Sequence, residues 1–334
     1  MLNIGVGLTN ACDLACAHCY RDTDGIDQLT PAQVMSICDA LPVRSINLGT
    51  GENGLHPEYA AIVRAIAERG IKLSLTSNGF TVERSSDETL RAFNEIEVSI
   101  DFPTESEQDA FRGHGNWKRV MVAIERARRA GVTITVLTVM MKTNFRRLAD
   151  IARVAFAMGA NYRVNVYQAV KTDAFTLSYD EYWEGFRRLL EATRLVSTTE
   201  PILNAVLGLP FPNGSGCGRQ TVRVTPRQEI IPCVYWNRSE LRLDALATLG
   251  AQGVLGSSEF VRTRTVPDLC RRCPLVEVCQ GGCAGRRQLA GDVGQPDPYC
   301  PLIRDERPTI AWARAETREL LKTGSACTTV LAPP

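Results

Sequence analysis

Three things are scarce in this sequence: long apolar runs, an excess of charge of either sign, and histidine. No apolar run approaches the roughly eighteen residues of a membrane-spanning helix, and the first residues lack the basic start and apolar core of a signal peptide. Lys and Arg number 38 against 37 Asp and Glu, so the net charge of +1 gives no reason to expect a nucleic acid or an acidic membrane surface as partner. We therefore expect a cytoplasmic protein that binds neither. The last of the three histidines is His114, which excludes zinc sites of mixed Cys and His type from residues 201–334.

Cysteine, by contrast, is abundant, with twelve in the chain. A disulfide framework is the expectation for a short secreted chain and not for a cytosolic one of 334 residues. Ten of the twelve cysteines fall into two groups with tight spacing, so bound metal is the better explanation. At 44% apolar and 22% charged residues, the chain can bury an ordinary core and is long enough for one large domain and a smaller one.

The first group lies in the stretch from Asn10 to Tyr20, where Cys12, Cys16 and Cys19 are separated by three and then two residues. Three thiolates do not make the four-ligand set of a structural zinc. On a [4Fe–4S] cube they leave one iron without a protein ligand, and an open metal position is where chemistry can take place. The alternative is that the three are small buried hydrophobic residues or one half of a zinc knuckle.

This spacing, with His18 and Tyr20 on either side of the third cysteine, resembles the signature of the radical SAM enzymes. The resemblance implies that Cys12, Cys16 and Cys19 hold a [4Fe–4S] cluster whose open iron binds S-adenosyl-L-methionine (SAM). It also implies reductive cleavage of SAM to a 5′-deoxyadenosyl radical, which abstracts hydrogen from a substrate. A flavodoxin or ferredoxin-type reductant would supply the electron.

Strands and helices alternate along residues 1–200. The hydrophobic patterns predict strands at 3–9, 45–48, 72–76, 95–101, 132–140 and 162–168, and helices at 59–69, 117–129, 146–158 and 177–196. A further helix is predicted to begin with Thr30 as N-cap and Pro31 in the first turn. Such alternation implies a parallel sheet with helices outside it, and six repeats fall short of the eight of a closed barrel. The predicted fold class is therefore α/β, a partial (β/α)6 TIM-like barrel with a small C-terminal Cys-rich iron–sulfur domain.

Glycine-rich and polar segments follow several of these strands, at the strand ends where parallel barrels place their chemistry. The segment from Gly49 to Gly54 resembles the Gly-Gly-Glu-Pro motif of radical SAM enzymes, with Thr50 and Asn53 in place of the second glycine and the proline. By that resemblance Glu52 holds the amino group of SAM, and polar residues at later strand ends hold its carboxylate and ribose. The alternative for each is a solvated strand end or turn. The predicted SAM-binding residues are Gly49, Thr50, Gly51, Glu52, Ser77, Asn78, Ser99 and Asp101.

The second group of cysteines lies in residues 201–308 and has the core spacing C-x2-C-x5-C-x3-C. This spacing closely resembles the SPASM domain, which follows many radical SAM barrels and carries two auxiliary iron–sulfur clusters. The resemblance implies that the first auxiliary cluster is held by Cys217, Cys233 and Cys283. It assigns the second to Cys270, Cys273, Cys279 and Cys300. These seven cysteines are one short of the eight ligands that two cubes need.

Four further expectations concern residues outside these sets. Cys327 could complete the first auxiliary cluster, but it lies in the C-terminal tail and we expect a free surface thiol. Cys38 is expected to be a core residue. Gln228 stands where the SPASM family has a glycine, which predicts an altered turn or a strained left-handed residue. A last helix is expected at 309–322, followed by a disordered end. The expected divisions are a radical SAM barrel (1–200), a SPASM domain (201–308), and a C-terminal helix and flexible tail (309–334).

The resemblance is specific for the superfamily and weakly specific for the reaction. The leading hypothesis is oxidative modification of a peptide or protein in natural-product maturation, by cross-linking, epimerisation or oxidation. Because the first strand already begins at Asn3, we expect a leader peptide to need a separate binding protein. One alternative is dehydrogenation, epimerisation or decarboxylation of a sugar-like small molecule in aminoglycoside or nucleoside antibiotic biosynthesis. Another is a non-catalytic zinc-stabilised scaffold. No catalytic acid or base is assigned.

Overall fold

A computed structural model describes residues 1–209, 216–236, 239–316 and 327–334. Within these ranges eleven strands form one continuous sheet in the order β10-β7-β11-β6-β5-β4-β3-β2-β1-β8-β9. The strands are β1 (Leu2–Val6), β2 (Val43–Leu48), β3 (Lys72–Ser77), β4 (Glu95–Ser99), β5 (Thr133–Met140), β6 (Asn161–Val166), β7 (Arg194–Thr198), β8 (Thr221–Val224), β9 (Ile230–Ile231), β10 (Ala313–Arg314) and β11 (Thr328–Ala332).

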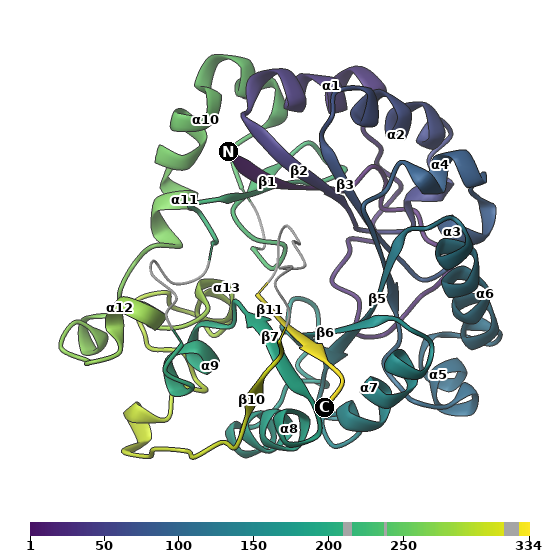
Figure 1. Cartoon of the computed structure of the whole chain (residues 1–334). Helices are drawn as coiled ribbons and strands as arrows, with labels where there is room; N and C mark the ends of the chain where they lie inside the picture. Colours follow the sequence, from purple (N-terminus) through teal and green to yellow (C-terminus); the bar gives the residue numbers. More distant parts are fainter. Residues whose placement is uncertain (210–215, 237–238, 317–326) are drawn as a thin grey trace.

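Strands β1 to β6 lie side by side in chain order and all run parallel. The sheet curves, and its order ends at β10 on one side and β9 on the other, so the barrel is partial (Figure 1). The predicted α/β fold class is thus confirmed, including the six parallel strands. Because these strands are parallel, all of their carboxyl ends meet at one edge of the sheet, where parallel barrels place their chemistry.

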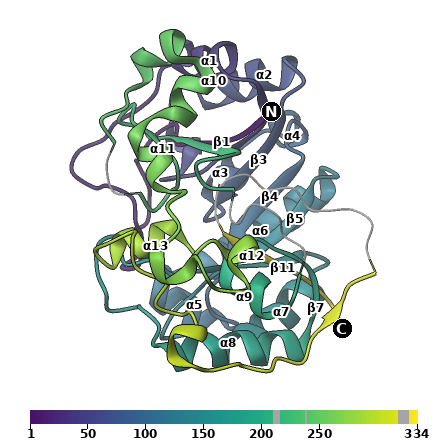
Figure 2. The same ribbon diagram turned by 90° about the vertical axis from the view of Figure 1, so that its left-hand side faces the viewer.

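Two sets of helices accompany the sheet. The first set follows the curve of the sheet on its outer side (Figure 1) and consists of α1 (Pro31–Ala40), α2 (Tyr59–Glu68), α3 (Phe80–Arg84), α4 (Asp87–Arg91), α5 (Glu105–Arg112), α6 (Asn116–Arg129), α7 (Leu148–Ala157) and α8 (Tyr179–Ala192). The second set follows β7 and consists of α9 (Pro201–Val206), α10 (Leu246–Gly256), α11 (Ser258–Arg262), α12 (Val276–Cys279) and α13 (Ala284–Leu289). Helix α10 packs on α1 and α12 packs on α9 (Figure 2). The described residues contain no helix long and apolar enough to cross a membrane.

Helix α1 begins where the sequence predicts. The Thr30 hydroxyl accepts a hydrogen bond from the Gln33 N–H, the Gln33 side chain accepts one from the Thr30 N–H, and Pro31 occupies the first turn. This reciprocal pair satisfies two of the donors that a helix start leaves free. The other strands and helices predicted for residues 1–200 are also present, with ends shifted by a few residues. The helix predicted for 177–196 is wrong at its end, because α8 stops at Ala192 and residues 194–196 belong to the unpredicted strand β7.

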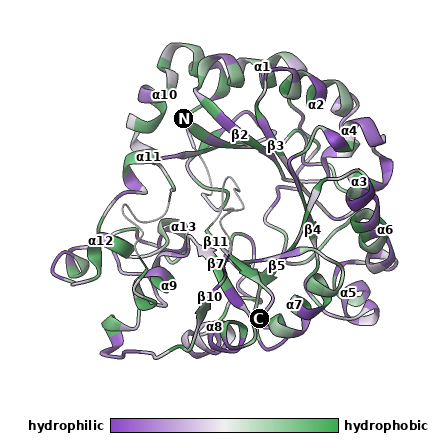
Figure 3. Ribbon diagram, viewed as in Figure 1, coloured by the Kyte–Doolittle hydropathy of each residue, from purple (hydrophilic) through white to green (hydrophobic). Residues whose placement is uncertain are grey.

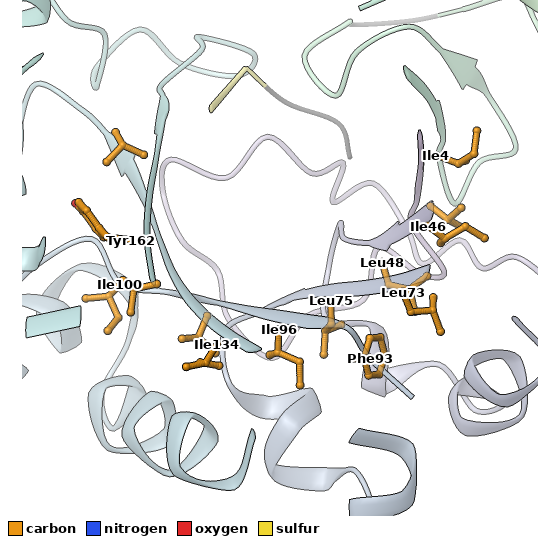
Figure 4. Close-up of a cluster of buried hydrophobic side chains, with 14 of the residues drawn as sticks. Ile4, Ile46, Leu48, Leu73, Leu75, Phe93, Ile96, Ile100, Ile134 and Tyr162 are labelled. Carbon is orange, nitrogen blue, oxygen red and sulfur yellow. The ribbon is translucent and has the colours of Figure 1, made fainter. Parts of the chain in front are cut away.

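The main core lies between the sheet and the outer helices. Side chains such as Ile46, Leu75, Ile96 and Ile134 point from the strands toward the helices (Figure 4) and are at most 5% exposed. The helices carry both hydrophobic and hydrophilic residues, and α6 is largely hydrophilic (Figure 3). This amphipathic pattern is the physical cause of the layering, since each helix buries its apolar stripe against the sheet.

The C-terminal part of the chain adds strands to the barrel sheet instead of forming a separate one. Strand β8 pairs parallel with β1, and β11 lies antiparallel between β6 and β7. The expected helix at 309–322 is wrong for residues 309–316, which form no helix and include the short strand β10, while 317–322 lie outside the described residues. The expected disordered tail is also wrong for β11, because its β-branched residues find backbone partners on two neighbouring strands. Gln228 does adopt a left-handed conformation, with φ of 65°.

Candidate active site

The loop after β1 carries Cys12, Cys16 and Cys19 at the carboxyl edge of the sheet. The Arg21 guanidinium fixes this loop by donating to the Leu14 carbonyl oxygen at 2.8 Å. The Cys19 N–H donates to the Cys16 carbonyl oxygen at 3.1 Å, which turns the chain between these two cysteines. All three side chains are partly exposed, and within the structure none forms a disulfide.

A cavity of about 200 Å³ lies between this loop and the carboxyl ends of the strands. The three thiols line it, together with the glycine-rich segment after β2 and the polar residues after β3 and β4. Every predicted site residue of the barrel except Asp101 belongs to this lining: Cys12, Cys16, Cys19, Gly49, Thr50, Gly51, Glu52, Ser77, Asn78 and Ser99. Residues from four separate segments of the sequence therefore share one concave site.

Close packing of the glycine-rich segment on the cysteine loop explains why Gly51 has no side chain. Its φ is +61°, and a Cβ added there would lie 2.4 Å from the Ala11 carbonyl oxygen and 2.6 Å from that of Thr9. The Glu52 N–H donates to the same Ala11 oxygen at 2.7 Å. Thr50, which stands in place of a family glycine, has φ of 88°, a strained conformation for a β-branched residue.

The Glu52 carboxylate is fully buried and already occupied by protein donors. Its Oε1 accepts from the Ser77 hydroxyl at 2.5 Å and from the Thr81 N–H at 2.9 Å, and its Oε2 accepts from the Asn78 N–H at 2.9 Å. Burial raises the pKa of this carboxyl, and the hydrogen bonds act against that shift. Glu52 thus holds the segment after β3 in place, and the SAM amino group would have to bind beside these existing partners.

Asp101 acts on the cavity through a neighbour. It has no solvent exposure, and it binds the Arg112 guanidinium, with Nε and Nη2 at 2.7 and 2.6 Å from Oδ2. Arg112 in turn lines the cavity beside Cys16 and Cys19. His18 stacks on a neighbouring phenylalanine ring, and burial lowers the pKa of His18 to about 4. Asp101 therefore orients a cation at the cysteine loop and does not itself line the cavity.

The floor of the cavity contains charged residues that the sequence analysis did not single out. Arg163 on β6 is 2% exposed and forms ion pairs with Glu97 and Glu95 on β4. Arg223 on β8 donates to the Thr50 hydroxyl at 2.5 Å and to the Tyr20 hydroxyl at 3.1 Å. A signal was present, because an arginine inside a strand of a parallel barrel is unusual and, when buried, must find a partner.

Four of the C-terminal cysteines surround a second, small pocket. Cys270, Cys273, Cys279 and Cys300 line it together with apolar side chains of α9 and its surroundings. This is the set predicted for the second auxiliary cluster, and the structure brings all four together. Burial raises the pKa of the Cys270 thiol and of the Cys279 thiol to about 11, so a bound cation is needed to keep them ionised near neutral pH.

The other C-terminal cysteines form a separate buried group. Cys217, Cys233 and Cys283 are each at most 6% exposed, and Cys217 and Cys233 belong to one cluster of buried side chains. A Cβ at Gly285 would lie 3.5 Å from the Cys233 Sγ and 3.9 Å from the Cys283 Sγ, so the glycine leaves space between the two sulfurs. The structure differs from the expectation for Cys327, which packs against this group instead of lying free at the surface.

Among the residues that the structure describes, no three His, Cys, Asp or Glu side chains are arranged to hold a single metal ion. A cube presents its irons at separate corners and takes its ligands from all around it.

Comparison with known proteins defines the class of this protein. Residues 6–155 match the Radical SAM superfamily, and these residues contain the cysteine loop and most of the cavity lining. The match identifies residues 6–155 as a radical SAM domain, and the second cysteine group follows it in the chain as in SPASM-type radical SAM enzymes. Members of this superfamily use a [4Fe–4S] cluster and SAM, and SPASM members carry auxiliary clusters as well.

Particular relatives cover nearly the whole chain. The chain is 25% identical over 335 residues to the mycofactocin maturase MftC of Mycolicibacterium smegmatis, covering 90% of this chain and 84% of the relative. It is 24% identical to the PqqA peptide cyclase of Ruegeria pomeroyi, with coverages of 92% and 89%. Among solved structures, SAM-bound SuiB of Streptococcus suis superposes with a TM-score of 0.68 at 17% identity, covering 90% of this chain and 77% of SuiB. AdoMet-bound anSMEcpe gives 0.69 at 14% identity, with coverages of 91% and 96%.

Proposed function

We propose that this enzyme binds a [4Fe–4S] cluster through Cys12, Cys16 and Cys19, binds SAM in the adjoining cavity, and modifies a peptide oxidatively during natural-product maturation. The observation that carries the proposal is the shared cavity, since three thiols and the glycine-rich and polar segments after β2, β3 and β4 all line it. These segments are far apart in the sequence, and only the folded sheet brings them to one cavity.

The residues present fit these cofactors. The three thiols open into the cavity with no fourth cysteine among its lining residues, as a cluster with one open iron requires. The Asn78 amide lies 3.7 Å from the Cys12 Sγ, and Gly51 allows the backbone of the glycine-rich segment to approach the loop closely. When bound, the cluster and SAM supply one-electron cleavage and hydrogen abstraction, and auxiliary clusters supply acceptors for electrons taken from the substrate.

The protein side chains around the cavity bind and orient. Ser77, Asn78 and Ser99 present polar groups at adjacent strand ends, where they can hold the carboxylate and ribose hydroxyls of SAM. Glu52 keeps the first two in position through its buried hydrogen bonds. Burial raises the pKa of the Cys16 thiol, and the positive charge of Arg112, which Asp101 orients, acts against that rise.

The C-terminal cysteines complete the proposed assembly. We assign the second auxiliary cluster to the four thiols that line one pocket, Cys270, Cys273, Cys279 and Cys300. The first is assigned to the buried group of Cys217, Cys233 and Cys283. We retain residues 1–200 as the radical SAM part and 201–308 as the SPASM part, although their strands share one sheet through β1 and β8.

The named relatives support a peptide as the substrate class. MftC is named a maturase, and other relatives that match this chain over most of its length are named PqqA peptide cyclases, so both groups of names point to peptide maturation. A flavodoxin or ferredoxin-type protein is the proposed electron donor. A separate leader-peptide-binding protein is the proposed second partner.

The cluster and the cavity are tested by anaerobic reconstitution with iron and sulfide, followed by SAM, a strong reductant and measurement of 5′-deoxyadenosine. We expect about twelve irons per chain for three cubes. Cys12→Ala should abolish 5′-deoxyadenosine release, whereas Cys38→Ala should retain it, because Cys38 lies in helix α1 and is not among the residues that line the cavity. Release by Cys12→Ala at the wild-type rate would refute the proposal.

The substrate class is tested by the stimulation of 5′-deoxyadenosine release. Candidate precursor peptides and aminoglycoside-like compounds should be compared at equal concentrations, with mass spectrometry of each substrate before and after reaction. The proposal expects a mass change in a peptide. A mass change confined to the sugar-like compounds would establish the alternative chemistry at the same site.

A further inference from the structure

The cysteines of the two C-terminal sets are unequal in number, and the structure shows which set is short. Two cubes need eight protein ligands if every iron is to be held by a cysteine, and residues 201–308 contain seven. The set around the second pocket is complete with four thiols. The missing ligand therefore belongs to the buried group of Cys217, Cys233 and Cys283.

Strand β11 carries Cys327 to that group. Its first residue, Thr328, pairs with Asn165 on β6, and the following Thr329 pairs with Thr198 on β7. The Thr328 N–H donates to the Thr199 hydroxyl at 2.9 Å, and the Thr199 N–H donates to the Thr328 carbonyl oxygen at 2.8 Å. Because β11 is antiparallel to β6, its amino end lies at the carboxyl edge of the parallel strands. The residue just before β11 thus reaches the edge where the clusters are proposed to bind.

The Cys327 side chain packs against the buried cluster of side chains that contains Cys217 and Cys233. Cys283 belongs to the same group, because the Cys233 and Cys283 Sγ atoms would lie 3.5 and 3.9 Å from one Cβ added at Gly285. The four sulfurs therefore converge from three separate segments of the chain, which no sequence spacing would suggest.

We propose that Cys327 is the fourth protein ligand of the first auxiliary cluster, together with Cys217, Cys233 and Cys283. The inference rests on the proposed function, which places a cluster among the other three. It assigns all eight ligands of the two auxiliary cubes to cysteine, so neither has an iron open to substrate. The iron beside Cys12, Cys16 and Cys19 is then the open one. The pairing of β11 with β6 and β7 also links the cluster directly to the barrel.

The test uses the full chain in a Cys12→Ala/Cys16→Ala/Cys19→Ala background, so that only auxiliary clusters are observed. After anaerobic reconstitution this background should hold about eight irons per chain. Isotopically labelled cyanide, which binds an iron that lacks a protein ligand, is added to the reduced protein. Electron–nuclear double resonance then reports whether the label is bound to a cluster. We expect no label signal in the background itself.

Adding Cys327→Ala should open one iron and produce the label signal, while adding Cys38→Ala should not. Cys327→Ser should keep the iron content and shift the electron paramagnetic resonance spectrum of the reduced cluster, since an oxygen replaces a sulfur.

A label signal in the background overturns the proposal, because Cys327 would then leave an iron open. If Cys327→Ala holds eight irons and gives no signal, the proposal is also overturned. If Cys327→Ala fails to fold, the background result alone decides. If the background protein binds no iron after reconstitution, the proposed auxiliary clusters themselves are overturned. The iron content of the background therefore distinguishes a failure of the proposed function from a failure of the Cys327 assignment.

Discussion

Replacing Arg163 by methionine should destabilise the fold, because it leaves two buried carboxylates without their counter-ion. The Arg163 side chain is 2% exposed, while those of Glu95 and Glu97 are 7% and 6% exposed. The guanidinium binds both carboxylates across the floor of the barrel, from β6 to β4. Methionine fills a similar length of space, so the change removes charge and hydrogen bonds more than volume.

The structure sets the magnitude of this loss near the lower end of the usual range. Removing one partner of a buried ion pair costs about 3–5 kcal/mol. Here each carboxylate keeps a hydroxyl donor, since Thr76 donates to Glu97 at 2.6 Å and Thr135 donates to Glu95 at 2.5 Å. Among the residues that the structure describes, the Arg163 Nε also has no hydrogen-bond partner, which lowers the value of the pair. We therefore expect a loss of about 3 kcal/mol, or a fall of about 6 °C in the unfolding midpoint at about 2 °C per kcal/mol.

The loss should depend on pH in a defined direction. Burial raises the pKa of Glu95, and the attraction of Arg163 acts against that rise, so removing Arg163 raises it further. A carboxyl whose pKa is higher in the folded state than in the unfolded state favours folding at low pH, and this contribution is lost as pH increases through the folded pKa. The deficit of Arg163→Met should therefore be smaller at about pH 5.5 than at about pH 8.

Thermal unfolding of the reconstituted protein measures both effects, with circular dichroism as the probe. The matched control is Arg153→Met on α7, because that arginine is 74% exposed and pairs with Asp150 at the surface. Its loss should stay within about 0.5 kcal/mol. If Arg163→Met lowers the midpoint no more than Arg153→Met, or lowers it more at acid pH, the reasoning from the buried pair is refuted.

Three further outcomes are expected. Gly51→Ala should cost about 1 kcal/mol for its positive φ and about 1–3 kcal/mol more for overlap with the Ala11 carbonyl. The control is Gly70→Ala, because Gly70 has φ of +70° and no described residue has an atom within 4 Å of an added Cβ. Gly70→Ala should cost about 1 kcal/mol alone, and equal thermal shifts for the two variants would contradict the overlap. Asp297→Asn should lower the iron content, because its carboxylate binds the buried Arg286 and accepts the Cys283 N–H at 2.8 Å, and unchanged iron would count against that role. Iron removal by an anaerobic chelator should lower the unfolding midpoint, since a ligand held only by the folded chain stabilises it; identical midpoints would contradict this.

Local rules account for the part of the fold that could be predicted from the sequence. The alternation of apolar runs gave the six parallel strands, because each strand and helix must bury one face whatever its partners are. The Thr30 and Pro31 pair marked the start of α1 through contacts within four residues. The spacing of the cysteines is also a local signal. Cysteines separated by only two or three residues must place their thiols close together, so the spacing predicted that they share one site.

Contacts between distant segments decided what the sequence analysis missed or got wrong. Arg163 could be assigned a place in the barrel floor only when β4 and β6 were known to be two strands apart in the sheet. The pairing of β11 between β6 and β7 is likewise non-local, and it turns an expected loose end into a strand.

The sequence by itself thus determined the chemistry of the ligands, because cysteine spacing and the glycine-rich segment are local properties. The tertiary structure alone decided which segments meet. It placed Cys327 against the buried group that contains Cys217 and Cys233, and it occupied Glu52 with hydrogen bonds from the segment after β3. The physical reason is that backbone pairing and burial act between residues far apart in the chain, where no short motif can record them.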